Sequence, residues 1–123
     1  MRFMSLVKAH ENHEAATPPS PELMAAIGKL AEEMFRAGKM VEMGGLLPSA
    51  RGARLRVAGG EVAVTDGPFT EAKELIGGYA ILQTASKAEA VELARQFLQV
   101  HIDVLGPSYT GELELRQLAE IPE

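Results

Sequence analysis

Two segments of the sequence read as strands with apolar side chains on both faces, and they constrain the fold more than any other feature. Residues 2–8 and 77–83 carry bulky apolar side chains at odd and at even positions, as Phe3 and Met4 do in the first segment. Successive side chains of a strand point to opposite faces, so a strand of this kind is buried on both. Each segment is therefore predicted to be a central strand of a sheet that is covered on both sides.

Two amphipathic helices are predicted. The first begins at residues 20–22, where Ser-Pro-Glu supplies an N-cap, a first-turn proline and an early acid. Its apolar stripe is formed by Leu23, Ile27, Leu30 and Met34, and Gly38 is placed to end the helix. The second begins at residues 86–89, where the serine and glutamate form a capping-box pattern. We expect it to run to about Gln99. Its buried stripe is predicted to contain Val91, Ala94 and Leu98.

The remaining strands are shorter. Residues 40–43 and 112–118 are predicted strands, the second with leucines on one face and charged side chains on the other. Residues 54–57 and 61–64 alternate around Ala-Gly-Gly, which predicts a hairpin because glycine supplies the positive φ of a tight turn. The arginines at 51, 54 and 56 are interpreted as part of a solvent-exposed face of this hairpin. A turn with one short helical turn at 70–74 then leads into the second central strand.

The order β-α-β, hairpin, β-α-β predicts the α+β class, with a ferredoxin-like arrangement, an inserted hairpin and both helices on one sheet face. A chain of 123 residues is the size of one domain, so residues 1–123 are expected to share one core. Two helices leave the second face of the central strands uncovered. A second copy of the chain is the economical cover, which predicts a homodimer.

Composition and charge exclude several classes of function. The net charge of −5 argues against a nucleic-acid partner, because affinity for phosphates comes from excess Lys and Arg. The absence of cysteine excludes disulfides, thiol nucleophiles and cysteine-ligated metals. The sequence has no signal-peptide pattern, no run long enough to span a membrane and no cofactor-binding motif. We therefore expect a cytoplasmic protein with no cofactor and no membrane partner.

The most distinctive string in the sequence is Thr-Asp-Gly-Pro-Phe-Thr at residues 65–70. Together with the glycine pairs at 44–45 and 77–78 and the segments 97–101 and 111–116, it resembles the YCII-related family, specifically its DGPF branch. The resemblance covers nearly the whole chain. It implies a dimeric ferredoxin-like α/β-barrel with a cleft between the sheet and the dimer partner. It also suggests an association with extracytoplasmic-function sigma factors, and some YCII relatives act on small molecules.

A histidine–aspartate pair, with the histidine on the first helix, is one proposal for the YCII branch. The first helix of this chain, residues 21–37, contains no histidine. Only the aspartate of that pair can be matched, to Asp66, so a general-base dyad is not carried over. Whether the protein is an enzyme stays open.

Asp66 is the candidate catalytic residue, because a carboxylate that is desolvated in a cleft can act as an acid or a base. The alternative is structural, since an aspartate before Gly-Pro commonly accepts backbone amide hydrogen bonds and stiffens a turn. Pro68 and Phe69 are interpreted as scaffold, and Phe69 is expected to anchor the turn in the core.

The candidate ligand-binding residues are polar side chains predicted near the cleft: Lys73, Tyr79, His10, Glu42 and His101. Lys73 is a candidate because its positive charge can bind an anionic ligand. The alternative is that it forms a solvent-exposed ion pair with a neighbouring carboxylate. Tyr79 begins a central strand, so its hydroxyl can reach the cleft while its ring packs. His10 follows the first strand closely, which places it at the cleft rim.

Residues 10–14, His-Glu-Asn-His-Glu, also raise the question of a metal. Zincins hold two histidines at i and i+4 on a helix, whereas His10 and His13 are separated by three positions in a loop. His101 supplies a third ligand only if the second helix ends beside that loop. No metal site is predicted, and a solvated polar loop is the simpler interpretation.

Two functions follow from the sequence. The first is a small-molecule binding protein or enzyme, with its cleft near Asp66 between the sheet and the dimer partner. The second is a non-catalytic regulatory or interaction module that works with a sigma factor. The first is favoured, because the polar Asp66 segment enters between two strands that are otherwise buried on both faces, and the second is the alternative.

Overall fold

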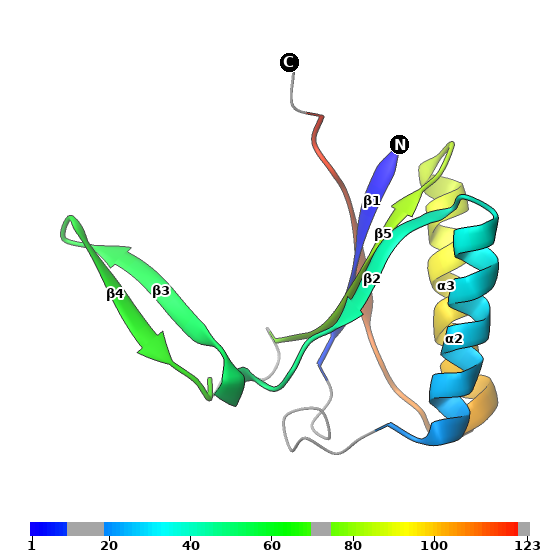
Figure 1. The fold of residues 1–123 in the computed structure, drawn as a ribbon, viewed down its shortest axis with the longest axis horizontal. Coiled ribbons are helices and arrows are strands. Elements are labelled where there is room, and N and C mark those ends of the chain that lie inside the picture. The colour runs from blue at the N-terminus through cyan, green and yellow to red at the C-terminus, as the bar shows by residue number, and fades with distance from the viewer. Residues whose placement is uncertain (10–18, 70–74, 121–123) are drawn as a thin grey trace.

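The computed structural model describes residues 1–9, 19–69 and 75–120. The elements in chain order are β1 (Arg2–Lys8), α2 (Pro21–Arg36), β2 (Met40–Gly45), the 3-10 helix η1 (Ser49–Arg51), β3 (Ala53–Ala58), β4 (Glu61–Asp66), β5 (Ile76–Gln83), α3 (Lys87–Leu105) and β6 (Leu113–Gln117). The chain is of the α+β class, with antiparallel sheets and two helices, consistent with a ferredoxin-like fold (Figure 1).

The main sheet has the strand order β2-β5-β1-β6, with antiparallel pairing throughout. The two segments with apolar side chains on both faces, β1 and β5, are its central strands, as predicted. Both helices lie against one face of this sheet (Figure 1), which we call the inner face. The opposite face, called the open face, carries no helix in the described part of the chain.

The core lies between the inner face and the helices. Phe3 and Leu82 are cross-strand neighbours on β1 and β5, and each is 3% exposed. They pack with Ala90 of α3, which is completely buried. Burial of these apolar side chains holds α3 against the two central strands, because removing apolar area from water is the main favourable contribution to folding.

Both helices begin at the predicted caps. The Ser20 side chain accepts a hydrogen bond from the Leu23 amide at 3.1 Å, and Ser86 does the same for Glu89 at 3.1 Å. These bonds satisfy amides that have no partner within the helix. Neither described helix is apolar enough along its length to span a membrane.

Helix α3 differs from its prediction in length and in register. It continues beyond Gln99 to Leu105 and ends at Gly106, whose φ is +95°. Its buried residues are Ala90, Ala94 and His101, whereas Val91 of the predicted stripe is 37% exposed. The polar residues after position 98 interrupt the apolar pattern, yet the histidine among them is buried against the sheet side. A pattern of hydrophobic residues alone therefore ends this helix too early.

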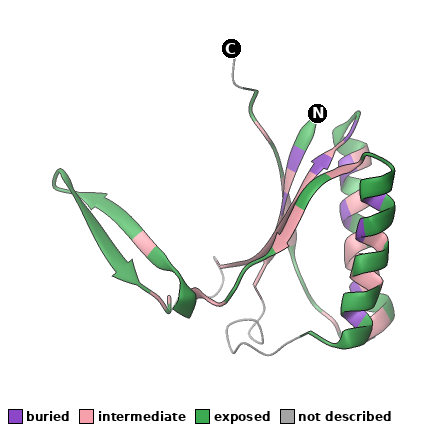
Figure 2. Ribbon diagram, in the orientation of Figure 1, coloured by how far each residue is buried: buried purple, intermediate pink, exposed green. Residues whose placement is uncertain are grey.

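Strands β3 and β4 form a separate two-stranded sheet. This hairpin, residues 53–66, extends from the edge of the main sheet on the side opposite the helices, and we call it the arm (Figure 1). Figure 2 shows that it is exposed along almost its whole length. The predicted hairpin is confirmed, but both of its faces are exposed, including the apolar one.

Candidate functional site

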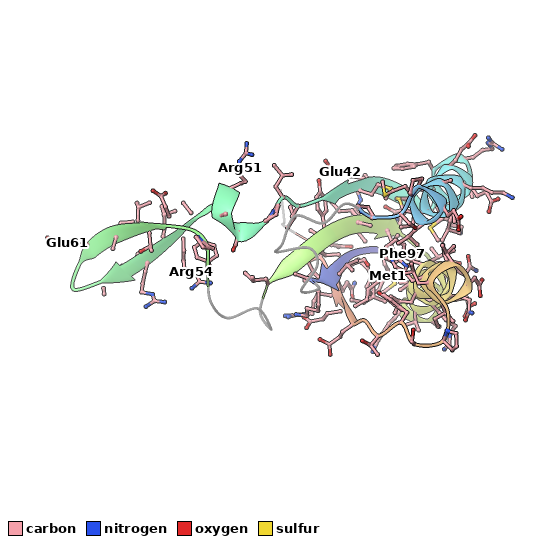
Figure 3. All side chains as sticks on the ribbon, turned by 90° about the horizontal axis from the view of Figure 1, so that it is seen from below. Met1, Glu42, Arg51, Arg54, Glu61 and Phe97 are labelled. Carbon is pink, nitrogen blue, oxygen red and sulfur yellow. The ribbon has the colours of Figure 1, made fainter. Side chains whose placement is uncertain are left out.

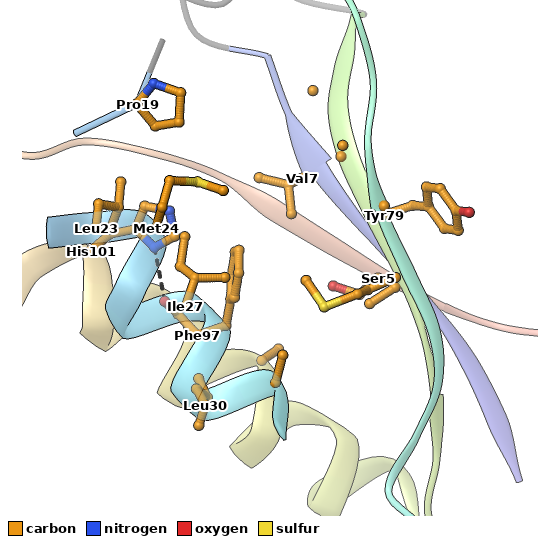
Figure 4. Close-up of a pocket in the computed structure, with 18 of the residues that line it drawn as sticks. Ser5, Val7, Pro19, Leu23, Met24, Ile27, Leu30, Tyr79, Phe97 and His101 are labelled. Atoms are coloured by element: carbon orange, nitrogen blue, oxygen red, sulfur yellow. Dashed lines mark hydrogen bonds between the residues drawn. The ribbon is translucent and has the colours of Figure 1, made fainter. Parts of the chain in front are cut away.

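A cavity of about 500 Å³ lies between the inner face of the main sheet and the two helices. Most of its wall is apolar, with contributions from α2, α3 and the three strands β1, β2 and β5. Ile27 and Leu30 of α2 and Phe97 of α3 face it from the helix layer (Figure 4). Ligand sites of proteins are usually concave, mostly apolar and about 300–1,000 Å³ in volume, so this cavity has the size and character of one.

Ser5 is a buried polar residue on the sheet side of the cavity, which Lys8 and Tyr79 also line. It lies at the centre of β1, its partners across the sheet are Ala80 and Leu115, and it is 5% exposed. Among the described residues, no side chain or backbone group makes a hydrogen bond with its hydroxyl. A buried hydroxyl without a partner costs free energy, because it has lost its hydrogen bonds to water. Ser5 therefore presents an unused donor and acceptor to the cavity.

His101 is a buried polar residue on the helix side. Its Nδ1 lies 2.9 Å from the carbonyl oxygen of Phe97, the contact drawn as a dashed line in Figure 4. A carbonyl only accepts, so Nδ1 donates and the Nε2 of the neutral ring is left with a lone pair. The ring is held between Phe97, at 4.7 Å between centroids, and Tyr109, at 5.1 Å. This packing fixes the imidazole on the cavity wall.

Tyr109 closes the same end of the cavity. Its ring stacks on His101 with an angle of 30° between the planes. Burial raises the pKa of Tyr109 above its ordinary value, because the charged phenolate is poorly solvated there. Neither Tyr109 nor Ser5 is among the site residues predicted from the sequence. The signal for Ser5 was a hydroxyl in the middle of a strand that is apolar on both faces.

Glu42 and Tyr79 form a second polar cluster, on the open face. Tyr79 contributes to the cavity wall from β5, but its ring points to the other side of the sheet from Ser5 and Val7 (Figure 4). A bulge between Met40 and Glu42 turns Glu42 to that face as well. The structure thus brings together two of the predicted ligand-binding residues.

Gly44 leaves space for the ring of Tyr79. The two residues are partners across β2 and β5, and a Cβ on Gly44 would lie 2.8 Å from Cε1 of Tyr79. The negative charge of Glu42 raises the pKa of the Tyr79 hydroxyl above its ordinary value, with smaller contributions from burial and from the hydrogen bond that the hydroxyl donates to Glu42. The phenol is therefore held in its protonated form.

Replacing Glu42 by Gln should lower the pKa of Tyr79 toward its ordinary value. The amide keeps a hydrogen-bond acceptor but removes the charge that opposes phenolate formation. The chain has two tyrosines, so Tyr109→Phe leaves Tyr79 as the single signal in an ultraviolet titration of tyrosinate. Because its pKa is raised, Tyr79 keeps its proton to a higher pH in the folded state than in the unfolded chain. The free energy of unfolding therefore falls as the pH rises above about 10, and it should fall less in the Glu42→Gln variant. An unchanged titration would contradict this account of the pair.

Asp66 lies at the end of β4, exposed, and is not among the residues that line the cavity. In the described part of the chain its carboxylate makes no hydrogen bond to a backbone amide. The Gly67 amide donates instead to the Gly52 carbonyl oxygen at 3.0 Å, and the Phe69 amide donates to Ser49 Oγ at 3.0 Å. Pro68 has no amide to donate. The turn is therefore held by η1 and the residue after it, without the aspartate.

Phe69 does not reach the main core, contrary to the expectation from the sequence. It is half-buried at the base of the arm, where the Arg54 guanidinium lies 4.2 Å from the centre of its ring. A cation over an aromatic face is attracted by the electron density of the ring. This segment does have a scaffold role, but it supports the arm and not the main core.

The predicted site residues thus separate into three places. Glu42 and Tyr79 share the open face, His101 lines the inner cavity, and Asp66 lies at the base of the arm. Lys73 and His10, with the neighbouring His13, lie outside the described residues. Among the residues that the structure does describe, no group of three or more His, Cys, Asp or Glu side chains is placed to hold a metal ion.

Comparison with known proteins identifies the family. The YCII-related domain model matches residues 1–104, which include both central strands, the arm and almost all of α3. The chain belongs to the YCII-related family. This YCII-related domain is also similar to an uncharacterised protein, R00369, from Rhizobium meliloti (strain 1021). The two are 35% identical over 97 residues, which cover 79% of this chain and 73% of the relative.

Proposed function

We propose that this YCII-related domain binds a small, mostly apolar molecule with one polar group in the cavity between its helices and its main sheet. The observation that carries the proposal is the Ser5 hydroxyl, which is 5% exposed, lines the cavity and has no hydrogen-bond partner among the described residues. Buried polar groups nearly always have a partner. A ligand in the cavity supplies one.

The other side of the cavity offers a complementary group. With Nδ1 donating to Phe97, the Nε2 of neutral His101 accepts a hydrogen bond from a ligand. Ser5 both donates and accepts, so a hydroxyl or carbonyl group on the ligand suits this pair of side chains. The apolar side chains of α2 then cover the rest of the molecule.

The sequence segment 66–69, Asp-Gly-Pro-Phe, further supports a place in the DGPF branch.

The methionines provide a direct test of where a ligand binds. Met24, Met34, Met40 and Met43 line the cavity, whereas Met4 lies in the strand position next to Ser5 and points to the open face. We expect 2-naphthol to shift the methyl NMR signals of the four cavity methionines and to leave the Met4 signal in place. Shifts confined to Met4 would place the site on the open face and contradict the proposal.

Two variants test the polar contacts. Ser5→Ala and His101→Phe should each weaken 2-naphthol binding by roughly 2- to 10-fold, the value of one neutral hydrogen bond. Binding of naphthalene, which has no hydroxyl, should change much less. Equal losses for both compounds would mean that neither side chain contacts the hydroxyl.

Ser5→Ala also separates a binding role from a structural role. If the hydroxyl lacks a protein partner, its removal should leave the free energy of unfolding unchanged or raise it by about 1 kcal/mol, because a desolvation cost disappears. A hydroxyl with a hidden structural partner would instead make the variant less stable. Urea unfolding without ligand measures the difference, and a clear destabilisation would remove the observation on which the proposal rests.

A further inference from the structure

The inner face of the main sheet has almost no side chains next to Ser5. Strand pairing places Ala80 opposite Ser5, and in the neighbouring row it places Gly78 opposite both Val7 and Gly45. Residues directly opposite each other point to the same face of a sheet, so Gly45, Gly78 and Ala80 belong to the inner face. All three line the cavity, and we call them its floor. Glycine inside a strand often marks a place where a ligand approaches the backbone closely.

The space above Gly45 is open. A Cβ on Gly78 would lie 3.2 Å from the carbonyl oxygen of Gly44, so packing within the sheet accounts for the glycine at position 78. A Cβ on Gly45 would have no heavy atom within 4 Å apart from its chain neighbours. The arm does not cover this space, because none of residues 53–66 line the cavity and the arm extends away from the helices in Figure 3. Packing among the described residues therefore does not require a glycine at position 45.

The wall opposite the floor is built from aromatic and flexible side chains. Phe97, His101 and Tyr109 form a continuous group of rings at one end of the cavity. Met24 of α2 lines the cavity and is 53% exposed, so it lies at the opening. Met43 flanks the floor, since it is the partner of Ala80 across β2 and β5. Methionine adapts its shape to a ligand, and its sulfur makes favourable contacts with aromatic rings.

We infer that the ligand of the cavity is a planar aromatic molecule of at least two fused rings with a hydroxyl group, and that it lies flat on the floor with its hydroxyl at Ser5. The inference rests on the proposed function and adds the chemical class of the ligand. A flat ring contacts the bare backbone on one side and the methionine and phenylalanine side chains on the other, each at about 3.5–4.0 Å. A puckered ring holds most of its carbon atoms farther from a flat surface.

The position of the floor sets the number of rings. Gly78 lies one strand and two residues away from Ser5. With strands about 4.8 Å apart and about 3.3 Å per residue along a strand, this separation is roughly 8 Å. A single ring whose hydroxyl contacts Ser5 ends before the glycines, whereas the second ring of a naphthol lies over them. Gly45 then leaves room for the far edge of the second ring.

Two naphthols that differ only in the second ring test the class of the ligand. In 5,6,7,8-tetrahydro-2-naphthol the ring with the hydroxyl is unchanged and the second ring is saturated and puckered. Burial of apolar area alone does not favour 2-naphthol, because the saturated ring has the larger apolar surface. We expect the unaltered protein to bind 2-naphthol about 2- to 10-fold more tightly in calorimetric titrations, the value of a specific aromatic contact.

The possible results separate the two proposals. Equal binding of both compounds, or tighter binding of the tetrahydronaphthol, would overturn the inference and leave the cavity function in place. Binding of neither compound would overturn the proposed function, and the inference with it.

Gly45→Ile tests the floor itself. The new side chain enters the open space, so we expect 2-naphthol to bind at least about 5-fold more weakly and phenol, which has one ring, to bind almost as before. Gly28→Ile is the matched control, because Gly28 is exposed on α2, does not line the cavity and also has space for a Cβ. Unchanged 2-naphthol binding in Gly45→Ile, or an equal loss for phenol, would show that the second ring does not lie on the floor.

The stability of the same variant excludes a purely structural role for this glycine. A side chain in place of glycine usually strengthens a strand, so Gly45→Ile should be at least as resistant to urea as the unaltered chain. A clearly less stable Gly45→Ile would mean that packing requires the glycine, and it would overturn the role given to Gly45.

Discussion

Gly67→Ala is expected to release the arm from its base while the main sheet stays folded. A Cβ at position 67 would overlap the carbonyl oxygen of Ser49, so the backbone of the turn or of η1 has to move. That movement breaks the Gly67–Gly52 and Phe69–Ser49 hydrogen bonds. Two hydrogen bonds of this kind contribute about 1–3 kcal/mol together, and this amount should be lost from the local stability of the arm.

Hydrogen exchange of the arm amides measures this local loss. Gly52→Ala is the matched control, because its Cβ would lie at an ordinary 3.6 Å from the same Ser49 oxygen and its φ is −116°. We expect faster exchange in β3 and β4 for Gly67→Ala, unchanged exchange in β1 and β5, and little effect of Gly52→Ala. Identical exchange in the two variants would contradict the role given to the turn.

Phe3→Ala should have the largest effect on global stability. Phe3 is 3% exposed and packs with Leu82 and Ala90 at the centre of the core. Truncating a buried phenylalanine removes its transfer free energy and leaves a cavity, at a cost of about 3–5 kcal/mol. Urea unfolding should therefore show a clearly lower midpoint with a similar slope.

The same truncation at Phe35 is the control. Phe35 lies in the last turn of α2 and is 44% exposed, so Phe35→Ala should cost about 1 kcal/mol or less. A Phe3→Ala variant no less stable than Phe35→Ala would mean that the core is not organised around β1 and β5.

Much of the fold follows from local sequence patterns. The two strands with apolar side chains on both faces could be predicted to be central. A strand carries apolar side chains on both faces where both faces of the sheet are covered. The helix starts follow from Ser20 and Ser86, whose side chains cap the first turns in the structure. The hydrophobic pattern predicts too early an end for α3, because burial of His101 depends on its packing between Phe97 and Tyr109 and not on hydrophobicity.

The arrangement of the site was less predictable. Glu42, Tyr79 and His101 were each selected from the sequence, yet the first two lie on the open face and the third in the inner cavity. The face that Glu42 occupies depends on the bulge after Met40. With regular alternation, Met40 and Glu42 would lie on the same side of the sheet. The exposure of the arm is likewise set by its tertiary placement, which the alternation of its residues does not specify.

The proposed function places a small apolar molecule in the inner cavity, in contact with Ser5 and His101. A crystal structure of the protein soaked with 2-naphthol tests it most directly. We predict electron density for the naphthol between the helices and the sheet, with its oxygen within hydrogen-bond distance of Ser5 Oγ or His101 Nε2. Naphthol density on the open face beside Tyr79 and Glu42, with side chains filling the inner cavity, would contradict the claim.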